Sequence, residues 1–86
     1  MNKQILDLRE ELNEIDQKLG KLLVRRFEIC KKIGENKKEN NLPIEDLERE
    51  KEIINEKINQ LDIPEDFVEE LFLLIFKHSK KIQNGN

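Results

Sequence analysis

The sequence predicts an all-α domain in which one long N-terminal helix is followed by two shorter helices. The 86 residues include only three glycines and two prolines, so few turns are expected. Apolar residues recur three and four positions apart over the first third of the chain, which is the spacing of a helical face. Charged residues make up 41% of the chain and hydrophobic residues 36%, which leaves little material for a monomeric core. We therefore expect one domain over residues 1–86 that shares apolar surface with a second copy.

The first helix is expected over residues 3–38. A heptad-type seam requires an apolar residue at position 26, but the sequence has Arg26 there. Pro43 disfavours helical conformation at Leu42 and is expected to close this helix. The apolar side chains of the seam are Ile5, Leu8, Leu12, Ile15, Leu19, Leu22, Ile29 and Ile33.

The second helix is expected over residues 47–60. Asp46 immediately precedes it and is a favourable N-cap residue. Glu50 lies where the apolar stripe of this helix should continue. The apolar members of that stripe are Leu47, Ile54, Ile58 and Leu61.

The third helix is expected over residues 63–83. Asp62 and Glu65 have the spacing of a capping box at its start. Ser79 interrupts its apolar face, and Gln83 lies one turn beyond Ser79. Its apolar side chains are Phe67, Val68, Leu71, Phe72, Ile75 and Ile82.

The length of the first helix indicates a homodimer. About 35 helical residues span ~52 Å, whereas a compact chain of this size has a radius of gyration of only ~12 Å. The helix therefore extends beyond any compact monomer, and its seam needs a partner there. The simplest partner is a second copy related by a two-fold axis.

Several polar side chains occupy positions where the helical patterns call for hydrocarbon. Taken alone, Arg26 could fix the register of a coiled-coil seam. Glu50 alone could belong to a solvated helix face, and Ser79 alone could be a small packing residue. Taken together they indicate a shared polar pocket, because a charge buried without a partner is costly. The set is mostly cationic, so an anionic ligand is expected. Its members are Arg26, Lys37, Glu50, Ser79 and Gln83.

The spacing of the cations suggests how one ligand is reached from two chains. Arg26 and Lys37 are 11 residues apart and face the same way, with Cα atoms ~16 Å apart along the axis. Arg9 lies on the same side of the helix but ~42 Å from Lys37. Arg9 cannot meet Lys37 within one chain, whereas in an antiparallel dimer the partner's Arg9 could reach the far end of the site.

Four segments in order resemble the AroQ-type, all-helical chorismate mutases. They are "LREELNEIDQKLGKLLVRR" at 8–26, "IGENK" at 33–37, "LPIEDLERE" at 42–50 and "LFLLIFKHSKKIQ" at 71–83. The resemblance implies a standalone enzyme that forms an intertwined homodimer of three-helix chains with two active sites. It implies an isomerase that converts chorismate to prephenate, on the route to phenylalanine and tyrosine, without a metal or cofactor.

The resemblance also implies roles for residues that would hold the carboxylates and the ether oxygen of chorismate. Arg26 and the partner's Arg9 match arginines that bind the carboxylates. Lys37 matches a lysine that bonds the ether oxygen and a carboxylate. Ser79 matches a polar contact to a carboxylate, and Gln83 matches the second donor to the ether oxygen.

Three further positions match residues around the substrate's ring hydroxyl. Asp46 matches a residue whose backbone amide lies near that hydroxyl. Arg49 matches an arginine that lines the site, and Glu50 matches the acid that binds the hydroxyl. The catalytic residues implied by the resemblance are Lys37, Gln83, Arg26 and Glu50.

The remaining features favour ordinary structural roles. The net charge of −3 and the lack of a basic stripe argue against nucleic-acid binding. We see no targeting segment and no apolar run of membrane-spanning length, so a cytoplasmic protein is expected. His78 is expected on the surface, Cys30 in apolar packing, and the lysine pairs 31–32 and 80–81 on solvated faces.

Two alternative functions remain open from the sequence. Isochorismate pyruvate lyases share this fold and similar pocket cations. A helical dimerisation module without catalysis would explain the seam, but not the polar residues that converge from three helices.

Overall fold

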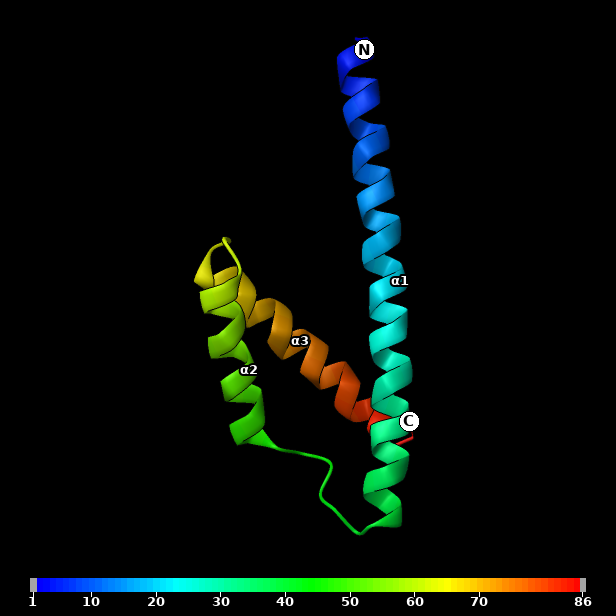
Figure 1. Cartoon of the computed structure of the whole chain (residues 1–86), viewed down its shortest axis with the longest axis vertical. Helices are drawn as coiled ribbons and strands as arrows, with labels where there is room; N and C mark the ends of the chain where they lie inside the picture. Colours follow the sequence, from blue (N-terminus) through cyan, green and yellow to red (C-terminus); the bar gives the residue numbers. More distant parts are fainter. Residues whose placement is uncertain (1, 86) are drawn as a thin grey trace.

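The computed structural model describes residues 2–85 and contains three helices. They are α1 (Lys3–Glu39), α2 (Leu47–Gln60) and α3 (Glu65–Gln83) (Figure 1). No strand occurs among the described residues. The predicted all-α fold with one long N-terminal helix is confirmed.

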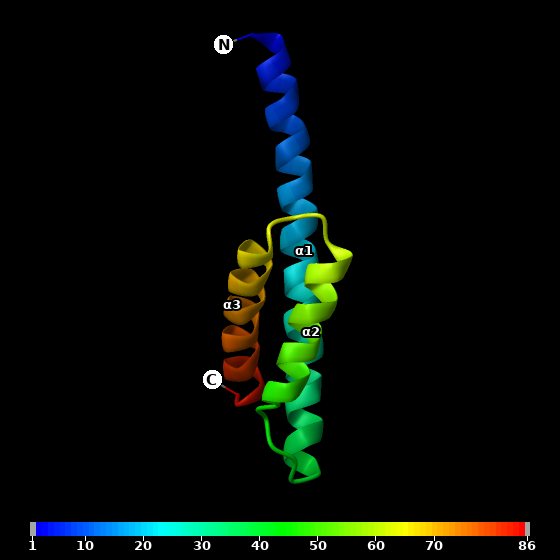
Figure 2. The same ribbon diagram turned by 90° about the vertical axis from the view of Figure 1, so that its left-hand side faces the viewer.

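The three helices form an elongated arrangement. α3 packs against both α1 and α2, and it crosses the C-terminal half of α1. The N-terminal half of α1 extends beyond the other two helices, as both ribbon views show (Figures 1 and 2). The radius of gyration is 16.7 Å and the longest dimension 58 Å. A compact chain of this length would have a radius of gyration of about 12 Å.

α1 ends through a backbone motif in the loop that follows it. Its last residue is Glu39, one position later than expected. Asn41 adopts the left-handed conformation, with φ of 55°. The Leu42 N–H donates to the Lys37 carbonyl at 2.8 Å, as in a Schellman motif. Because asparagine tolerates this conformation better than most residues, the stop comes from Asn41 and not from Pro43 alone.

α2 begins as the sequence predicts. The Asp46 side chain accepts a hydrogen bond from the Arg49 N–H at 3.0 Å and is the N-cap. Glu48 and Glu50 lie in the first turn, where negative charge interacts favourably with the helix dipole.

α3 begins at Glu65, two residues later than expected. Its N-cap is Pro64, and no side chain caps the helix, so the expected capping box of Asp62 and Glu65 is wrong. The physical reason is that Ile63 precedes a proline, whose ring disfavours helical conformation at the residue before it. Glu65 and Asp66 provide negative charge in the first turn instead.

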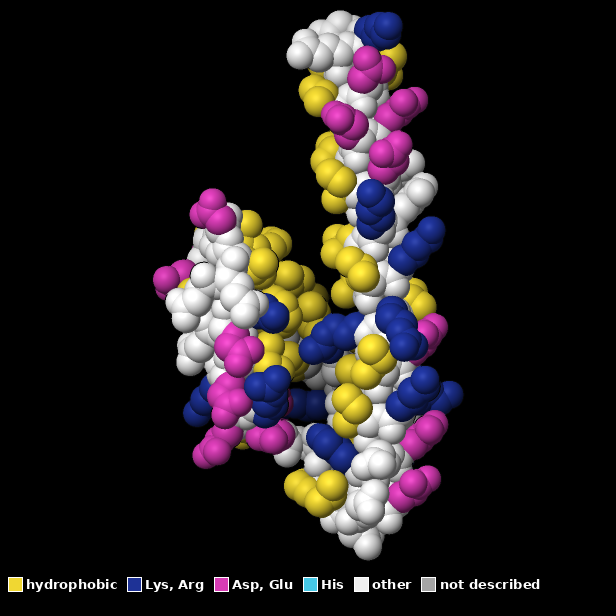
Figure 3. Space-filling view, in the orientation of Figure 1, with side chains coloured by type: hydrophobic (Ala, Val, Ile, Leu, Met, Phe, Trp, Pro, Cys, Tyr) yellow, Lys and Arg dark blue, Asp and Glu magenta, His cyan; other side chains and the backbone are white. Residues whose placement is uncertain are grey.

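Little apolar surface is buried within one chain. The buried apolar side chains among the described residues are Cys30, Val68 and Phe76. A row of yellow side chains follows the N-terminal half of α1 (Figure 3). The seam residues Leu8, Leu12, Ile15, Leu19 and Leu22 are between 51 and 68% exposed. Such a large exposed apolar row is typical of an interaction surface.

None of the described helices is both long enough and apolar enough to cross a membrane.

Candidate active site

A cavity of about 300 Å³ lies between the C-terminal parts of α1 and α3 and the start of α2. Cys30, Ile33, Ile44, Ile53 and Phe76 supply its apolar lining. In Figure 3, dark blue Lys and Arg side chains gather in the hollow between α1 and α2. The polar side chains that line the cavity are Arg26, Lys37, Asp46, Arg49, Glu50, Ser79, Lys80 and Gln83.

Arg26 is held in place from α3. Its Nη1 atom donates to Ser79 Oγ at 3.0 Å, and its guanidinium carbon lies 5.8 Å from the centre of the Phe76 ring. The Ser79 hydroxyl in turn donates to the Ile75 carbonyl at 2.7 Å. Ser79 is only 4% exposed, so this polar pair replaces hydrocarbon at the junction of the helices. The guanidinium is therefore fixed by a hydrogen bond and by a cation–π contact.

Lys37 and Gln83 form a second polar pair, which lies near the C-terminal ends of α1 and α3. Lys37 Nζ donates to the Ile44 carbonyl at 2.9 Å and to Gln83 Oε1 at 3.4 Å. Because Gln83 accepts through its amide oxygen, its two amide N–H groups remain as potential donors to a ligand. The Lys37 carbonyl also accepts the hydrogen bond that ends α1, so backbone and side chain of this residue are both fixed.

Gly34 allows α3 to approach α1 at this point. A Cβ atom at position 34 would lie 2.6 Å from both the Cα and the carbonyl oxygen of Gln83. Such a distance is far inside van der Waals contact, and the clashing atoms are backbone. The missing side chain is therefore what brings Gln83 to its place beside Lys37.

Asp46 and Arg49 form the rim of the cavity at the start of α2. One Asp46 carboxylate oxygen is engaged in capping the helix. Arg49 pairs with Glu52 at 3.1 Å and Glu56 at 3.9 Å. Arg49 remains 55% exposed, so these pairs are weak and the guanidinium can be recruited by a ligand.

Glu50 and Lys80 form an ion pair across the cavity. Lys80 Nζ lies 2.9 Å from Glu50 Oε2, and the Glu50 side chain is only 16% exposed. Lys80 also contacts Glu45 at 3.0 Å. The hydrogen bond to Glu50, followed by that to Glu45, raises the pKa of Lys80 above its ordinary value.

Lys80 is the site residue that the sequence reasoning missed, since it was expected on a solvated face. Its position offered a signal, because Lys80 follows Phe76 by four residues and precedes Gln83 by three. These spacings place the three side chains on one face of α3. The neighbouring Lys81 is exposed, as expected.

Arg9 does not line this cavity. It lies on the exposed N-terminal half of α1, ~42 Å from Lys37 by the helical rise. The structure thus brings seven of the eight expected site residues together within one chain, and Arg9 stays apart.

His78 and Cys30 occupy the environments that the sequence predicts for them, the surface and apolar packing. His78 is exposed and does not contribute to the cavity lining. Cys30 is 6% exposed, and its Sγ atom lies 3.7 Å from Arg26 Nη1.

The charges of the lining define the kind of ligand it suits. Four cationic side chains and two acidic ones line the cavity, which gives a net charge of +2. Fixed cations in a small, partly apolar cavity favour a small dianion, and arginine suits its carboxylates because the guanidinium bonds them bidentately. The fold and the cavity therefore define an all-helical protein with a net cationic cavity that suits a small anion.

Comparison with known proteins gives the family. The sequence model of the family "Chorismate mutase type II" matches residues 8–84, and the chain belongs to this family. The chorismate mutase of Methanocaldococcus jannaschii is 30% identical over 96% of this chain and 87% of its own length. The bifunctional chorismate mutase/prephenate dehydratase of Buchnera aphidicola from Acyrthosiphon pisum is 36% identical over 95% of this chain. This chain spans 22% of that bifunctional relative.

A solved structure agrees with the fold. A conserved hypothetical protein from Pyrococcus furiosus superposes with a TM-score of 0.81 and is 36% identical. The match covers 96% of this chain and 99% of the other.

Proposed function

We propose that this chain is a chorismate mutase, an isomerase that rearranges chorismate to prephenate for phenylalanine and tyrosine biosynthesis. The observation that carries the proposal is the convergence of Arg26, Lys37 and Gln83 on one cavity of about 300 Å³. Membership of the chorismate mutase type II family supports the same substrate.

The first task of the site is to hold a flexible dicarboxylate in its compact, reactive conformation. Arg26 is suited to this, because Ser79 and Phe76 fix its guanidinium before a ligand arrives. A planar fork held in this way binds a carboxylate bidentately with little loss of entropy. Ser79 adds a polar contact at the same carboxylate.

The second task is to stabilise the charge that develops as the C–O bond breaks. Negative charge builds on the ether oxygen in the transition state, so donors fixed there stabilise it more than the ground state. Lys37 supplies a full positive charge and Gln83 a neutral N–H. Lys37 also orients Gln83 through its amide oxygen, so that the N–H groups face the substrate.

The start of α2 recognises the ring hydroxyl. Glu50 accepts a hydrogen bond from it, and the backbone amide of Asp46 lies near it. Arg49 lies at the rim, and its guanidinium exchanges its ion pairs with Glu52 and Glu56 for a contact to the substrate. The rearrangement is intramolecular and involves no nucleophile, proton transfer, metal or cofactor.

A second copy of the chain completes the site. The apolar row of α1 from Leu8 to Leu22 is exposed within one chain, and this part of α1 extends beyond α2 and α3, where a second chain can pack against it (Figures 1 and 2). In an antiparallel homodimer, the partner's Arg9 enters the far end of the cavity and binds a carboxylate. Two identical sites result from the two-fold symmetry.

Product identification tests the activity. The purified chain is offered chorismate and isochorismate separately, and the products are identified by NMR. We expect prephenate from chorismate and no appreciable salicylate or pyruvate from isochorismate. Salicylate and pyruvate as the main products would indicate a lyase, and no turnover of either substrate would favour a non-catalytic module.

A further inference from the structure

Lys80 connects two walls of the cavity. Its Nζ atom lies 2.9 Å from Glu50 Oε2 and 3.0 Å from Glu45 Oε1, although Lys80 is on α3 and both acids lie at or before the start of α2. The other ion pairs among the described residues run within a single helix, and they are Arg25–Glu28, Arg49–Glu52 and Arg49–Glu56. Lys80 therefore makes the ionic connection between α2 and α3.

We propose that Lys80 is a positioning residue that holds the Glu50 carboxylate toward the cavity and thereby sets selectivity for the ring hydroxyl of the substrate. The inference rests on the proposed function, because it concerns how Glu50 recognises that hydroxyl.

The geometry of the pair carries this proposal. Lys80 binds Oε2 of Glu50, which leaves Oε1 free to accept a hydrogen bond from a ligand. Glutamate has three rotatable side-chain bonds, so without this contact its carboxylate would turn toward solvent or toward the cavity cations. Glu50 is 16% exposed and Glu45 is 59% exposed, so the contact to Glu50 is the less screened of the two. Glu45 holds the ammonium group from the outer side.

The charge balance leads to the same conclusion. With Lys80, the lining that one chain supplies carries four cations and two acids, and this net positive charge favours an anionic substrate. Without Lys80, the Glu50 carboxylate would be left partly buried and unpaired beside a substrate with two negative charges. Binding would weaken because like charges repel strongly where water is partly excluded.

Three substitutions separate the charge of Lys80 from its bulk. Lys80→Met keeps the length of the stem and removes the charge, Lys80→Arg keeps a cation, and Lys81→Met is the matched control on an exposed neighbour. We expect Lys80→Met to lower kcat/KM for chorismate about tenfold or more, mainly through KM, since a hydrogen bond to a charged group is disturbed. Lys80→Arg should restore most of the loss, and Lys81→Met should stay within about twofold.

A double-mutant cycle with Glu50 provides a readout that a purely structural role would not give. If Lys80 acts through Glu50, Lys80→Met should change kcat/KM by less than about twofold in the Glu50→Ala background. A second test uses a chorismate analogue that carries hydrogen in place of the ring hydroxyl. For this analogue, Lys80→Met as a single substitution should also change kcat/KM by less than about twofold. Circular dichroism checks folding, and Lys80→Gln replaces Lys80→Met if the latter loses helix.

The outcomes distinguish this inference from the proposed function. Turnover of chorismate by the wild type tests the function itself, and its absence would overturn both. If the wild type is active, an unchanged kcat/KM in Lys80→Met overturns the positioning role alone. The positioning role would also be overturned if Lys80→Met lowered kcat/KM by the full loss of about tenfold in the Glu50→Ala background or with the analogue.

Discussion

Arg26 interrupts the apolar row of α1, and in the folded chain its side chain faces a cavity. The same holds for Lys37, Glu50, Ser79 and Gln83, whose positions were predictable because each one breaks a helical pattern. Lys80 was not predictable in this way. Its place beside Lys81 resembles a solvated pair, and only the packing of α3 against α2 brings its ammonium group to Glu50.

Gln83→Glu should make activity depend on pH. The amide of Gln83 donates at any ordinary pH, whereas a carboxyl group donates only when protonated, and its ordinary pKa is about 4.3. We expect wild-type kcat/KM to be roughly flat from pH 5 to 8 and that of the variant to rise as the pH falls. The measurement is a kcat/KM profile for chorismate. Full activity of Gln83→Glu at pH 8 would rule out Gln83 as a donor to the ether oxygen.

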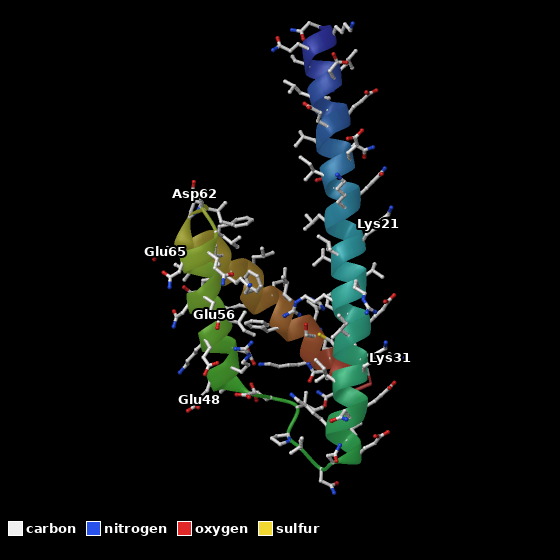
Figure 4. All side chains as sticks on the ribbon, viewed as in Figure 1. Lys21, Lys31, Glu48, Glu56, Asp62 and Glu65 are labelled. Carbon is white, nitrogen blue, oxygen red and sulfur yellow. The ribbon has the colours of Figure 1, made fainter. Side chains whose placement is uncertain are left out.

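Lys37→Ala should lower kcat about 10²- to 10³-fold, because it removes a fixed donor to developing charge. Lys31→Ala is the control, since Lys31 lies on the side of α1 turned away from α2 (Figure 4). Steady-state kinetics of both variants check this expectation. Equal activity of the two variants would show that Lys37 does not stabilise the transition state.

At the scale of the helices, local sequence signals explain most of the boundaries. The Asp46 cap was visible in the sequence and is made as predicted. The stop of α1 depends on a left-handed Asn41, which Pro43 alone does not predict. The close approach of α1 and α3 could not be predicted, because the sequence does not show that Gly34 lies against the backbone of Gln83.

Gly34→Ala should reduce activity without reducing helix content. A Cβ atom there would lie 2.6 Å from the Gln83 backbone, so the end of α3 must move, and small displacements of catalytic groups are costly. We expect kcat/KM to fall about tenfold or more, although alanine favours helix over glycine by about 1 kcal/mol. Gly20→Ala is the matched control, because a Cβ atom there meets nothing within 4 Å. If Gly34→Ala behaved like Gly20→Ala in both activity and circular dichroism, the contact would have no catalytic importance.

At the scale of the whole molecule, one chain leaves much apolar surface uncovered. The length of α1 was predictable from the helical pattern over residues 3–38, and the apolar row from Leu8 to Leu22 is exposed because this part of α1 extends beyond the other two helices. The detailed packing of two chains in the proposed homodimer could not be predicted, since a heptad seam fixes a contact face and not the full path of a partner.

Leu19→Glu should weaken self-association. Leu19 is 55% exposed within one chain, so the change costs little there, but a charge buried at a dimer interface is strongly unfavourable. We expect the wild type to sediment at twice the mass of one chain and the variant to shift toward single chains at the same concentration. A wild type that sediments as a single chain would contradict the homodimer.

We propose that a second copy of the chain completes the catalytic site, and complementation between two inactive variants is the direct test of such a shared site. Arg9→Ala and Arg26→Ala should each nearly abolish turnover of chorismate. After subunit exchange, the mixed dimers contain one intact site, so about a quarter of the wild-type activity should return. The measurement is the rate of chorismate loss before and after exchange, with exchange verified by mass spectrometry. No recovery despite verified exchange would contradict a site shared between two chains.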